Sequence, residues 1–318
     1  MFDLAAGANR LPRRATRRLV AAAVGLAALL PAACGDSDGG SSSGNGNDRP
    51  LTISAIPDQD PSKLGRLYGD VAAYLTRELG VKVVYKPVTD YPASVSGFRL
   101  GDLDLVWFGG FTSVQAEKQV AGAKSVAQRE IDGNFHSVFI ANTKSGIAPM
   151  PDVAGLSALK GRRFTFGSET STSGRLMPQY YLDQAGVKTT DFRGPPGFSG
   201  SHDATIREVA SGSYEAGALN EQVWKSSVAD GTVKRDKVRA VLTTPGYPDY
   251  RWLGQPDLDE RFGAGFTDRV TRAFVALDPA DPKEKAILEL FGAERFVKPD
   301  PGAYSLTKEA VDKLGLGG

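Results

Sequence analysis

Apolar runs of two different periods alternate along residues 51–108, and this alternation restricts the fold more than any other feature of the sequence. The β-prone run 51–56 ends at Pro57, and residues 61–79 then carry apolar side chains at helical spacing. We predict a second strand over 81–88, a short helix over 91–100 and a third strand over 103–108. Such a βαβαβ unit implies a parallel sheet with ligand sites at the carboxyl ends of its strands.

The same pattern restarts after a predicted strand at 137–142, so we expect a second α/β lobe. Its predicted helices cover 156–160, 174–185, 204–210 and 221–230, and its predicted strands cover 163–166, 215–219 and 238–243. The tail is helical again over 267–276 and 283–291, as if it returned to complete the first lobe. At 318 residues the chain is long enough for two compact units. We expect one lobe at 49–142 plus 244–318 and the other at 143–243.

The N-terminus has the pattern of an export signal over residues 1–33. Arginines precede a 12-residue apolar run at 19–30, and small residues follow it; the arginines are Arg10, Arg13, Arg14, Arg17 and Arg18. As a helix, twelve residues span about 18 Å, well short of a hydrocarbon core of roughly 30 Å, which disfavours a permanent membrane helix. The alternative is a buried N-terminal helix. Arg17 and Arg18 also resemble a twin-arginine signal, so the export route stays open.

Cys34 is the single cysteine of the chain, which excludes intrachain disulfides and cysteine-rich metal sites. Its place after Ala32 and Ala33 resembles the lipobox of bacterial lipoproteins, although Pro31 stands where that family prefers leucine. We therefore expect a lipidated Cys34, and residues 34–48 as a solvated Gly- and Ser-rich tether. Residues 1–33 hold five of the 38 basic and one of the 37 acidic residues. The rest of the chain therefore has 33 basic and 36 acidic residues and a net charge of −3. That balance gives no reason to expect a nucleic acid partner.

A Gly- and hydroxyl-rich loop at 166–174 leads from a predicted strand into a predicted helix. This arrangement gathers backbone N–H groups, the positive end of the helix dipole and several hydroxyls, and so suits an oxyanion. The alternative is a helix cap rich in Ser and Thr. No Gly-Lys-Ser/Thr follows, so the loop is not a nucleotide-hydrolysing P-loop.

Several motifs in the order of the chain resemble the phosphonate- and phosphite-type substrate-binding proteins of bacterial ABC importers. They are residues 89–91 (Thr-Asp-Tyr), 101–109 (Gly-Asp-Leu-Asp-Leu-Val-Trp-Phe-Gly), 171–174 (Ser-Thr-Ser-Gly) with Pro178, and 200–203 (Gly-Ser-His-Asp). The resemblance covers roughly residues 51–291 and is strongest to members labelled as selenate-binding components. It implies a type II periplasmic-binding-protein fold, in which two α/β lobes joined by two crossing strands close on a ligand in the cleft.

The resemblance also implies which residues contact the anion. In the first lobe this is Tyr91, and in the second lobe the contacts are Ser171, Thr172, Ser173 and His202. Hydroxyls and loop N–H groups donate to oxyanion oxygens, and a nearby histidine gains affinity for an anion if it is protonated. Each residue also has a structural alternative, such as a half-buried aromatic for Tyr91 or a cap neighbour for His202. His136 is either at the cleft edge or structural.

Departures from the family bear on the ligand. Phe108 stands where aminoalkylphosphonate binders carry a second aromatic hydroxyl, and Asn220, Glu221 and Gln222 align near their ammonium-binding glutamate. Gln222 at that place would favour a ligand with no charged amine, such as phosphite, phosphate, methylphosphonate or selenate, whereas Glu221 would keep the amine.

Asp249 is expected on the return crossing, with a turn residue as the alternative. A carboxylate there would accept from a protonated phosphorus oxyanion and repel a fully ionised selenate or sulfate.

We expect a monomeric, non-enzymatic lipoprotein outside the cytoplasm, with a permease and its ATPase as partners and with no cofactor or metal. An extracytoplasmic sensor is the alternative. An exported serine acyl enzyme is disfavoured, because the two Ser-x-x-K matches at 157–160 and 305–308 lack companion motifs.

Overall fold

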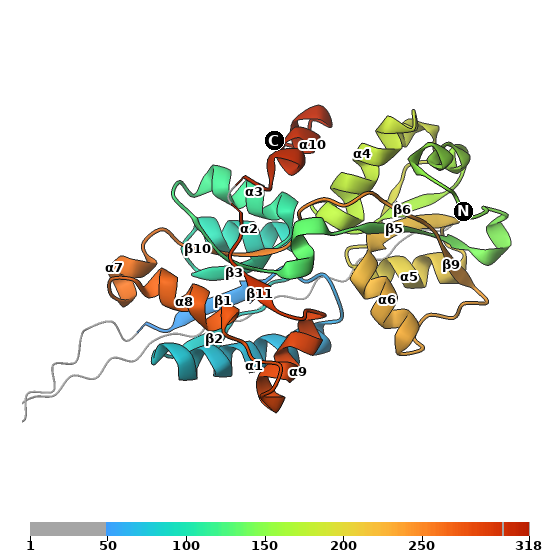
Figure 1. The fold of residues 1–318 in the computed structure, drawn as a ribbon. Coiled ribbons are helices and arrows are strands. Elements are labelled where there is room, and N and C mark those ends of the chain that lie inside the picture. Colours follow the sequence, from blue (N-terminus) through green and yellow to red (C-terminus); the bar gives the residue numbers. More distant parts are fainter. Residues whose placement is uncertain (1–48, 301, 318) are drawn as a thin grey trace, which may run out of the picture. The chain divides into compact units, whose positions relative to one another are not determined.

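A computed structural model describes residues 49–300 and 302–317. The expected export signal, the lipidation of Cys34 and the whole of the expected tether at 34–48 lie outside these residues. Among the described residues, no helix is long and apolar enough to cross a membrane. The predicted α/β architecture is confirmed, with two separate sheets that are each flanked by helices (Figure 1).

The first lobe is built on a six-stranded sheet of order β11-β4-β10-β3-β1-β2. Its strands are β1 (Leu51–Ala55), β2 (Val83–Tyr85), β3 (Leu105–Phe108), β4 (Lys124–Arg129), β10 (Arg251–Gly254) and β11 (Phe296–Val297). Strand β1 pairs in parallel with β2 and β3, whereas β10 pairs antiparallel with β3 and β4. The helices of this lobe are α1 (Pro61–Leu79), α2 (Tyr91–Arg99), α3 (Gly110–Gln119), α7 (Leu258–Phe262), α8 (Phe266–Val275) and α9 (Pro282–Phe291).

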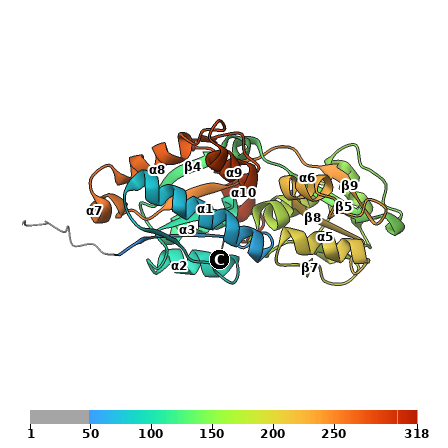
Figure 2. The same ribbon diagram turned by 90° about the horizontal axis from the view of Figure 1, so that it is seen from below.

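The second lobe is built on a five-stranded sheet of order β7-β6-β8-β5-β9. Its strands are β5 (Ser137–Asn142), β6 (Phe164–Phe166), β7 (Gly197–Phe198), β8 (Ala216–Asn220) and β9 (Val238–Thr243). Its helices are α4 (Met177–Gln184), preceded by the π-helical turn η4 (Thr172–Leu176), α5 (His202–Ser211) and α6 (Glu221–Ala229). Helices α5 and α6 pack on strands β5 and β8 (Figure 2).

Strand β5 corrects the expected domain boundary at residue 142. Its residues pair antiparallel with both β8 and β9, so Ser137–Asn142 belong to the second sheet and not to the first lobe. The apolar pattern of the strand predicts its existence but not its partners, because both sheets can bury an apolar strand equally well.

Two chain segments cross between the lobes, as the resemblance implies. The outgoing segment precedes β5 and the returning segment lies between β9 and β10, and the two form one antiparallel bridge at Phe135 and Tyr247. The N–H of Asp249 donates to the Asp132 carbonyl (3.0 Å), which joins the crossings a second time.

Helix α1 illustrates how local sequence sets an element. Asp60 is its N-cap and accepts from the N–H groups of Ser62 (2.9 Å) and Lys63 (3.3 Å), while Pro61 occupies the first turn. The helix ends at Gly80, whose φ of 68° is the left-handed conformation that glycine adopts at little cost. The predicted bounds 61–79 are therefore confirmed.

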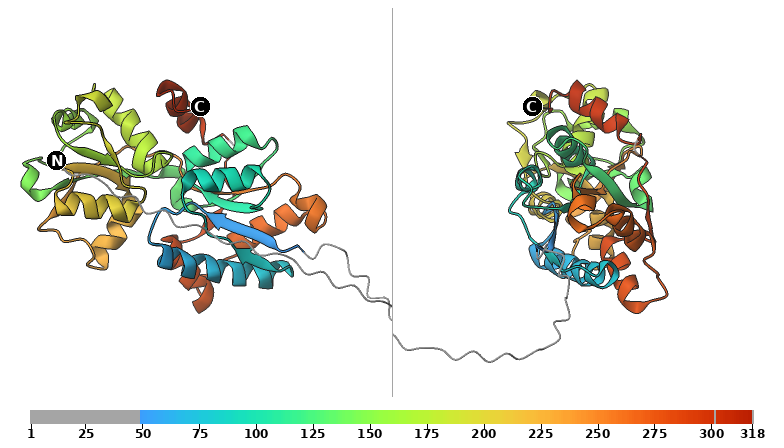
Figure 3. Two further views of the ribbon diagram at one scale, coloured as in Figure 1. Left: turned by 180° about the vertical axis from the view of Figure 1, so that it is seen from behind. Right: turned by 90° about the vertical axis from the view of Figure 1, so that its left-hand side faces the viewer.

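The C-terminal helix α10 (Ser305–Lys313) contacts elements of both lobes, namely α3 in the first and η4 and α4 in the second (Figure 3). Tyr180 of α4 donates to Glu309 (3.2 Å), and Lys313 forms an ion pair with Asp183 (3.0 Å). These pairs add an attachment between the lobes beyond the two crossings.

A buried cation stands where the outgoing crossing leaves β4. The Arg129 guanidinium lies over the rings of Tyr250 (4.9 Å), Phe135 (5.4 Å) and Trp107 (5.5 Å). Asp132 accepts from Arg129 Nε (2.8 Å) and Nη2 (2.5 Å). Both side chains are almost completely buried, so each charge depends on the other for compensation.

We expect Arg129→Ala to lower the free energy of unfolding by about 3–5 kcal/mol, because it leaves the Asp132 carboxylate buried and unpaired. The matched control is Arg295→Ala, which removes the exposed ion pair with Glu130 and should cost less than about 1 kcal/mol. Denaturant unfolding of both variants measures the difference. Equal losses would contradict the role of the buried pair.

Candidate functional site

The first turn of α3 lies where the two lobes meet, and distant residues cap it. Its N-cap residue is Gly109, which has no side chain to accept from the helix. Instead Asp249 Oδ1 accepts from the Gly110 N–H (2.9 Å), and Thr172 Oγ1 accepts from the Phe111 N–H (3.0 Å). One helix terminus thereby joins the first lobe, the return crossing and the hydroxyl-rich loop of the second lobe.

Asp249 is fully buried, and only one of its carboxyl oxygens is satisfied. Its Oδ2 has no hydrogen-bond partner among the described residues. Burial raises the pKa of Asp249 to about 7, against the opposing effects of the Gly110 N–H and the Thr172 hydroxyl. At neutral pH this carboxyl is therefore divided between its protonated and ionised forms, and Oδ2 can either donate or accept.

Tyr91 begins α2 and is buried, with its hydroxyl close to Ser171 of the second lobe. The hydroxyl oxygens of Tyr91 and Ser173 have no hydrogen-bond partner among the described residues. Burial raises the pKa of Tyr91 well above its usual value, so its hydroxyl stays a donor. Ser171 caps the following turn by accepting from the Gly174 N–H (3.0 Å).

Close backbone packing holds the 167–174 loop in shape. The Gly167 N–H donates to the Gly174 carbonyl (2.8 Å). A Cβ added at Gly174 would lie 3.1 Å from the Gly167 Cα. The two ends of the loop therefore lie too close together for a side chain at either glycine. Ser137 of the second sheet donates to the Ser173 carbonyl (2.8 Å) and fixes the loop from behind.

His202, at the start of α5, lies in a neighbouring network and has partners on both ring nitrogens. Nδ1 accepts from the Asn220 N–H (3.4 Å), so the proton is on Nε2, which lies 3.3 Å from the Tyr250 hydroxyl. Burial lowers the pKa of His202 to about 3, and the imidazole is neutral in this structure. The charged histidine considered from the sequence is thus not what the fold sets up, although a bound anion in contact would raise this pKa.

The three residues considered for the ammonium site have different partners in the structure. Glu221 forms an ion pair with Lys225 one turn later (2.9 Å). Asn220 caps α6 by accepting from Gln222 N–H (2.7 Å) and Val223 N–H (3.1 Å), and its Nδ2 donates to the Tyr250 hydroxyl (3.0 Å). Gln222 lines an interlobe cavity of about 160 Å³ that also reaches Asp58 and Tyr250.

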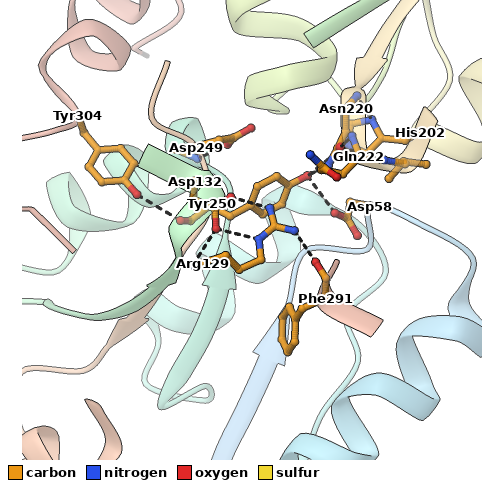
Figure 4. Close-up of polar contacts among 12 residues, drawn as sticks. Asp58, Arg129, Asp132, His202, Asn220, Gln222, Asp249, Tyr250, Phe291 and Tyr304 are labelled. Carbon is orange, nitrogen blue, oxygen red and sulfur yellow. Dashed lines mark hydrogen bonds and ion pairs between the residues drawn. The ribbon is translucent and has the colours of Figure 1, made fainter. Parts of the chain in front are cut away.

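The sequence reasoning missed Asp58 and Tyr250, which complete the cleft. Asp58 follows β1, and its Oδ2 accepts from the Tyr250 hydroxyl (3.0 Å) (Figure 4). Burial raises the pKa of Asp58 to about 6. The position of Asp58 just past the first strand is a signal that could have found it, because ligand sites collect at the carboxyl ends of parallel strands.

Two other candidates are structural. The Phe108 ring is buried edge-on against Phe98 (5.7 Å). His136 lies on the outgoing crossing with its Nδ1 2.7 Å from the Thr244 carbonyl, which joins the two crossings. Across residues 49–300 and 302–317 there is no group of three or more His, Cys, Asp or Glu side chains that could hold a metal ion.

This arrangement suits a small oxyanion with a proton to share. The hydroxyls of Tyr91 and Ser173 and the N-terminal turn of η4 supply donors, while Asp249 supplies one atom that can accept. An anion that carries no proton would find hydrogen-bond donors here. It could contact Asp249 only if that carboxyl were itself protonated.

We expect Gly109→Ala to lower the free energy of unfolding by about 1–3 kcal/mol, because the new Cβ would lie 2.9 Å from Thr172 Oγ1 and 3.2 Å from Asp249 Oδ1. Gly65→Ala in α1 is the matched control, since nothing lies within 4 Å of its Cβ and the helix should gain stability. Denaturant unfolding compares the two. A neutral Gly109→Ala would show that the lobes do not approach this closely.

The comparisons with known proteins identify the family and agree with the fold. Residues 53–304 match the family described as ABC transporter, phosphonate, periplasmic substrate-binding protein. The chain is 45% identical over 269 residues to the Probable ABC transporter phosphite binding protein PhnD1 of Prochlorococcus marinus, covering 84% of this chain and 91% of that protein. It is 30% identical over 236 residues to the Phosphate-import protein PhnD of Mycolicibacterium smegmatis, covering 70% and 71%.

Among solved structures, PhnD1 of Prochlorococcus marinus in complex with methylphosphonate superimposes with a TM-score of 0.83. The match covers 85% of this chain and 99% of that one. The chain therefore belongs to the family of periplasmic substrate-binding proteins that serve phosphonate ABC transporters.

Proposed function

We propose that this chain captures a small phosphorus oxyanion that can carry a proton, with phosphite and methylphosphonate as the first candidates, and delivers it to an ABC permease. The observation that carries the proposal is Asp249 Oδ2, a buried carboxyl oxygen without a partner among the described residues, close enough to the donor Tyr91 to raise the pKa of that hydroxyl. The name of one relative includes phosphite, and its solved structure holds methylphosphonate.

The donors set the charge of the ligand. Micromolar affinity corresponds to a binding free energy of about 8 kcal/mol. Hydrogen bonds to a charged group contribute roughly 1.5–3 kcal/mol each, so five or six of them supply this free energy after the cost of closing the lobes. These local donors outweigh the net charge of −3 expected for the chain without residues 1–33.

The groups around the cleft indicate which substituent the phosphorus atom carries. Glu221 is held by Lys225 and Gln222 is uncharged, so neither offers a free carboxylate to an ammonium group. This favours hydrogen or a methyl group as the substituent on phosphorus over an aminoalkyl chain.

Selenate stays a prediction that no comparison supports. A fully ionised selenate or sulfate has no proton to donate to Asp249, and an ionised carboxylate repels it.

The family places the protein outside the cytoplasm, and a permease partner follows from the same membership. We propose in addition that Cys34 carries a lipid anchor, that an ATPase powers the permease and that the folded part is a monomer. The alternative of a sensor and the disfavoured acyl enzyme have no support from the relatives, which are named as transport binding proteins.

A thermal-shift panel on the purified protein at pH 8 tests the ligand class. Phosphite or methylphosphonate at 100 times its dissociation constant should stabilise the fold by about 2.7 kcal/mol, whereas selenate, sulfate and 2-aminoethylphosphonate should give no shift. Asp249→Asn replaces the carboxylate by an amide that can donate, so it should reduce the preference for phosphite over sulfate. A wild-type shift with sulfate as large as with phosphite would overturn the assignment of Asp249.

The affinity for phosphite should fall as the pH rises above about 7. The complex holds one proton between Asp249 and the ligand, whose pKa values both lie near neutrality, so binding above this range must take up a proton. Because the pKa of Asp249 is raised to about 7, the loss should approach tenfold per pH unit once both groups are ionised. Calorimetric titrations from pH 6 to 9 measure this slope, and a flat profile would contradict proton sharing.

A further inference from the structure

The hydroxyl of Tyr250 has a complete set of hydrogen bonds, and they come from three separate parts of the chain. It donates its single proton to Asp58 Oδ2 (3.0 Å). Its oxygen accepts from Asn220 Nδ2 (3.0 Å) and lies 3.3 Å from His202 Nε2, the protonated nitrogen of that ring. One donated and two accepted bonds use the full capacity of a hydroxyl group.

The two sides of this network belong to different lobes. Asp58 follows β1, and Tyr250 directly precedes β10, so both are attached to the six-stranded sheet. Asn220 ends β8 and His202 begins α5, so both are attached to the five-stranded sheet. The bonds that Tyr250 accepts therefore join the lobes, whereas the bond it donates lies within the first lobe.

The first-lobe side of the network is held in place independently of the second lobe. The Tyr250 ring stacks on Trp107 (5.6 Å, 17°) and lies under the Arg129 guanidinium. The Tyr250 carbonyl accepts from the Tyr304 hydroxyl (3.3 Å). With the ring fixed, the direction of the hydroxyl proton is the remaining variable, and Asp58 determines it.

We propose that Asp58 is a positioning residue for ligand capture: by taking the single proton of the Tyr250 hydroxyl, it makes that oxygen the acceptor on which His202 and Asn220 dock when the lobes close. The Asp58 carbonyl adds a direct bond, because it accepts from the His202 N–H (3.0 Å). Together these bonds hold the second-lobe residues His202 and Asn220 against the first lobe in the closed arrangement.

This inference rests on the proposed function for its ligand but concerns lobe closure. Asp58→Ala should speed phosphite dissociation about tenfold, the factor expected for about one lost hydrogen bond, and leave the association rate unchanged. Asp58→Asn retains an oxygen that can accept from Tyr250 and should stay within about threefold of the wild type. Tyr250→Phe removes the hydroxyl itself and with it both interlobe bonds, so it should speed dissociation at least as much as Asp58→Ala. The double variant should be no faster than Tyr250→Phe, because Asp58 acts only through that hydroxyl.

The matched control is Asp203→Asn. Asp203 is next to His202 and also joins the lobes, since its Oδ2 accepts from the Asp60 N–H (2.8 Å), but this bond is exposed. Asp203→Asn should change the rate of phosphite dissociation less than twofold.

Single-molecule energy transfer on the full chain measures closure with and without ligand. Dyes are attached to Asp70→Cys in α1 and Lys234→Cys between α6 and β9, both exposed, in a Cys34→Ser background that leaves no other cysteine. Without ligand, Asp58→Ala should reduce the closed fraction about tenfold and Tyr250→Phe at least as much, whereas Asp203→Asn should not reduce it. An unchanged closed fraction in Asp58→Ala and Tyr250→Phe, an equal effect of Asp203→Asn, or additive effects of the two substitutions would overturn the inference. If neither phosphite nor methylphosphonate closes the wild type, the proposed function fails, while the ligand-free comparison still decides the role of Asp58.

Discussion

The first turn of α3 has no cap of its own, and the way its N–H groups are satisfied holds the whole site together. Unsatisfied N–H groups at a buried helix terminus are costly, so Gly110 and Phe111 must find acceptors elsewhere. They find Asp249 on the return crossing and Thr172 in the second lobe. The glycine at 109 is what lets these two acceptors approach. A single helix end thus joins the first lobe to the hydroxyl-rich loop and to Asp249, the buried carboxyl that the proposed function assigns to a proton on the ligand.

The charges around the cleft explain how a site with two buried carboxyls can receive an anion. Burial raises the pKa of both Asp58 and Asp249, which reduces their negative charge near neutrality. Arg129 acts in the opposite direction on both, from a cage of aromatic rings next to Tyr250. Its guanidinium is held by Asp132 and by the Phe291 carbonyl (2.7 Å), so it contributes electrostatic potential to the cleft while its position stays fixed.

The elements with strong local signals could be predicted from the sequence. Helix α1 has a cap, a proline and a terminal glycine, and its predicted bounds are those observed. Strand β4 and helix α3 were not predicted, since α3 begins Gly-Phe-Thr-Ser without a capping side chain and depends on tertiary contacts. The hydroxyl-rich loop could be predicted because hydroxyls at a helix start are a local pattern, and the family resemblance implied Tyr91. Asp58 and Tyr250 become neighbours only through the fold.

By itself the sequence determined the alternation of strands and helices, the family and the loop that offers donors to an oxyanion, because each depends on residues close together in the chain. Only the tertiary structure decided that β5 joins the second sheet, since either sheet could bury it. The fold also decided that His202 is neutral with both nitrogens engaged, and that one buried oxygen of Asp249 has no partner within the part of the chain that the structure describes. Protonation and hydrogen-bond direction depend on burial and on partners distant in the chain, and these are properties that no local pattern carries.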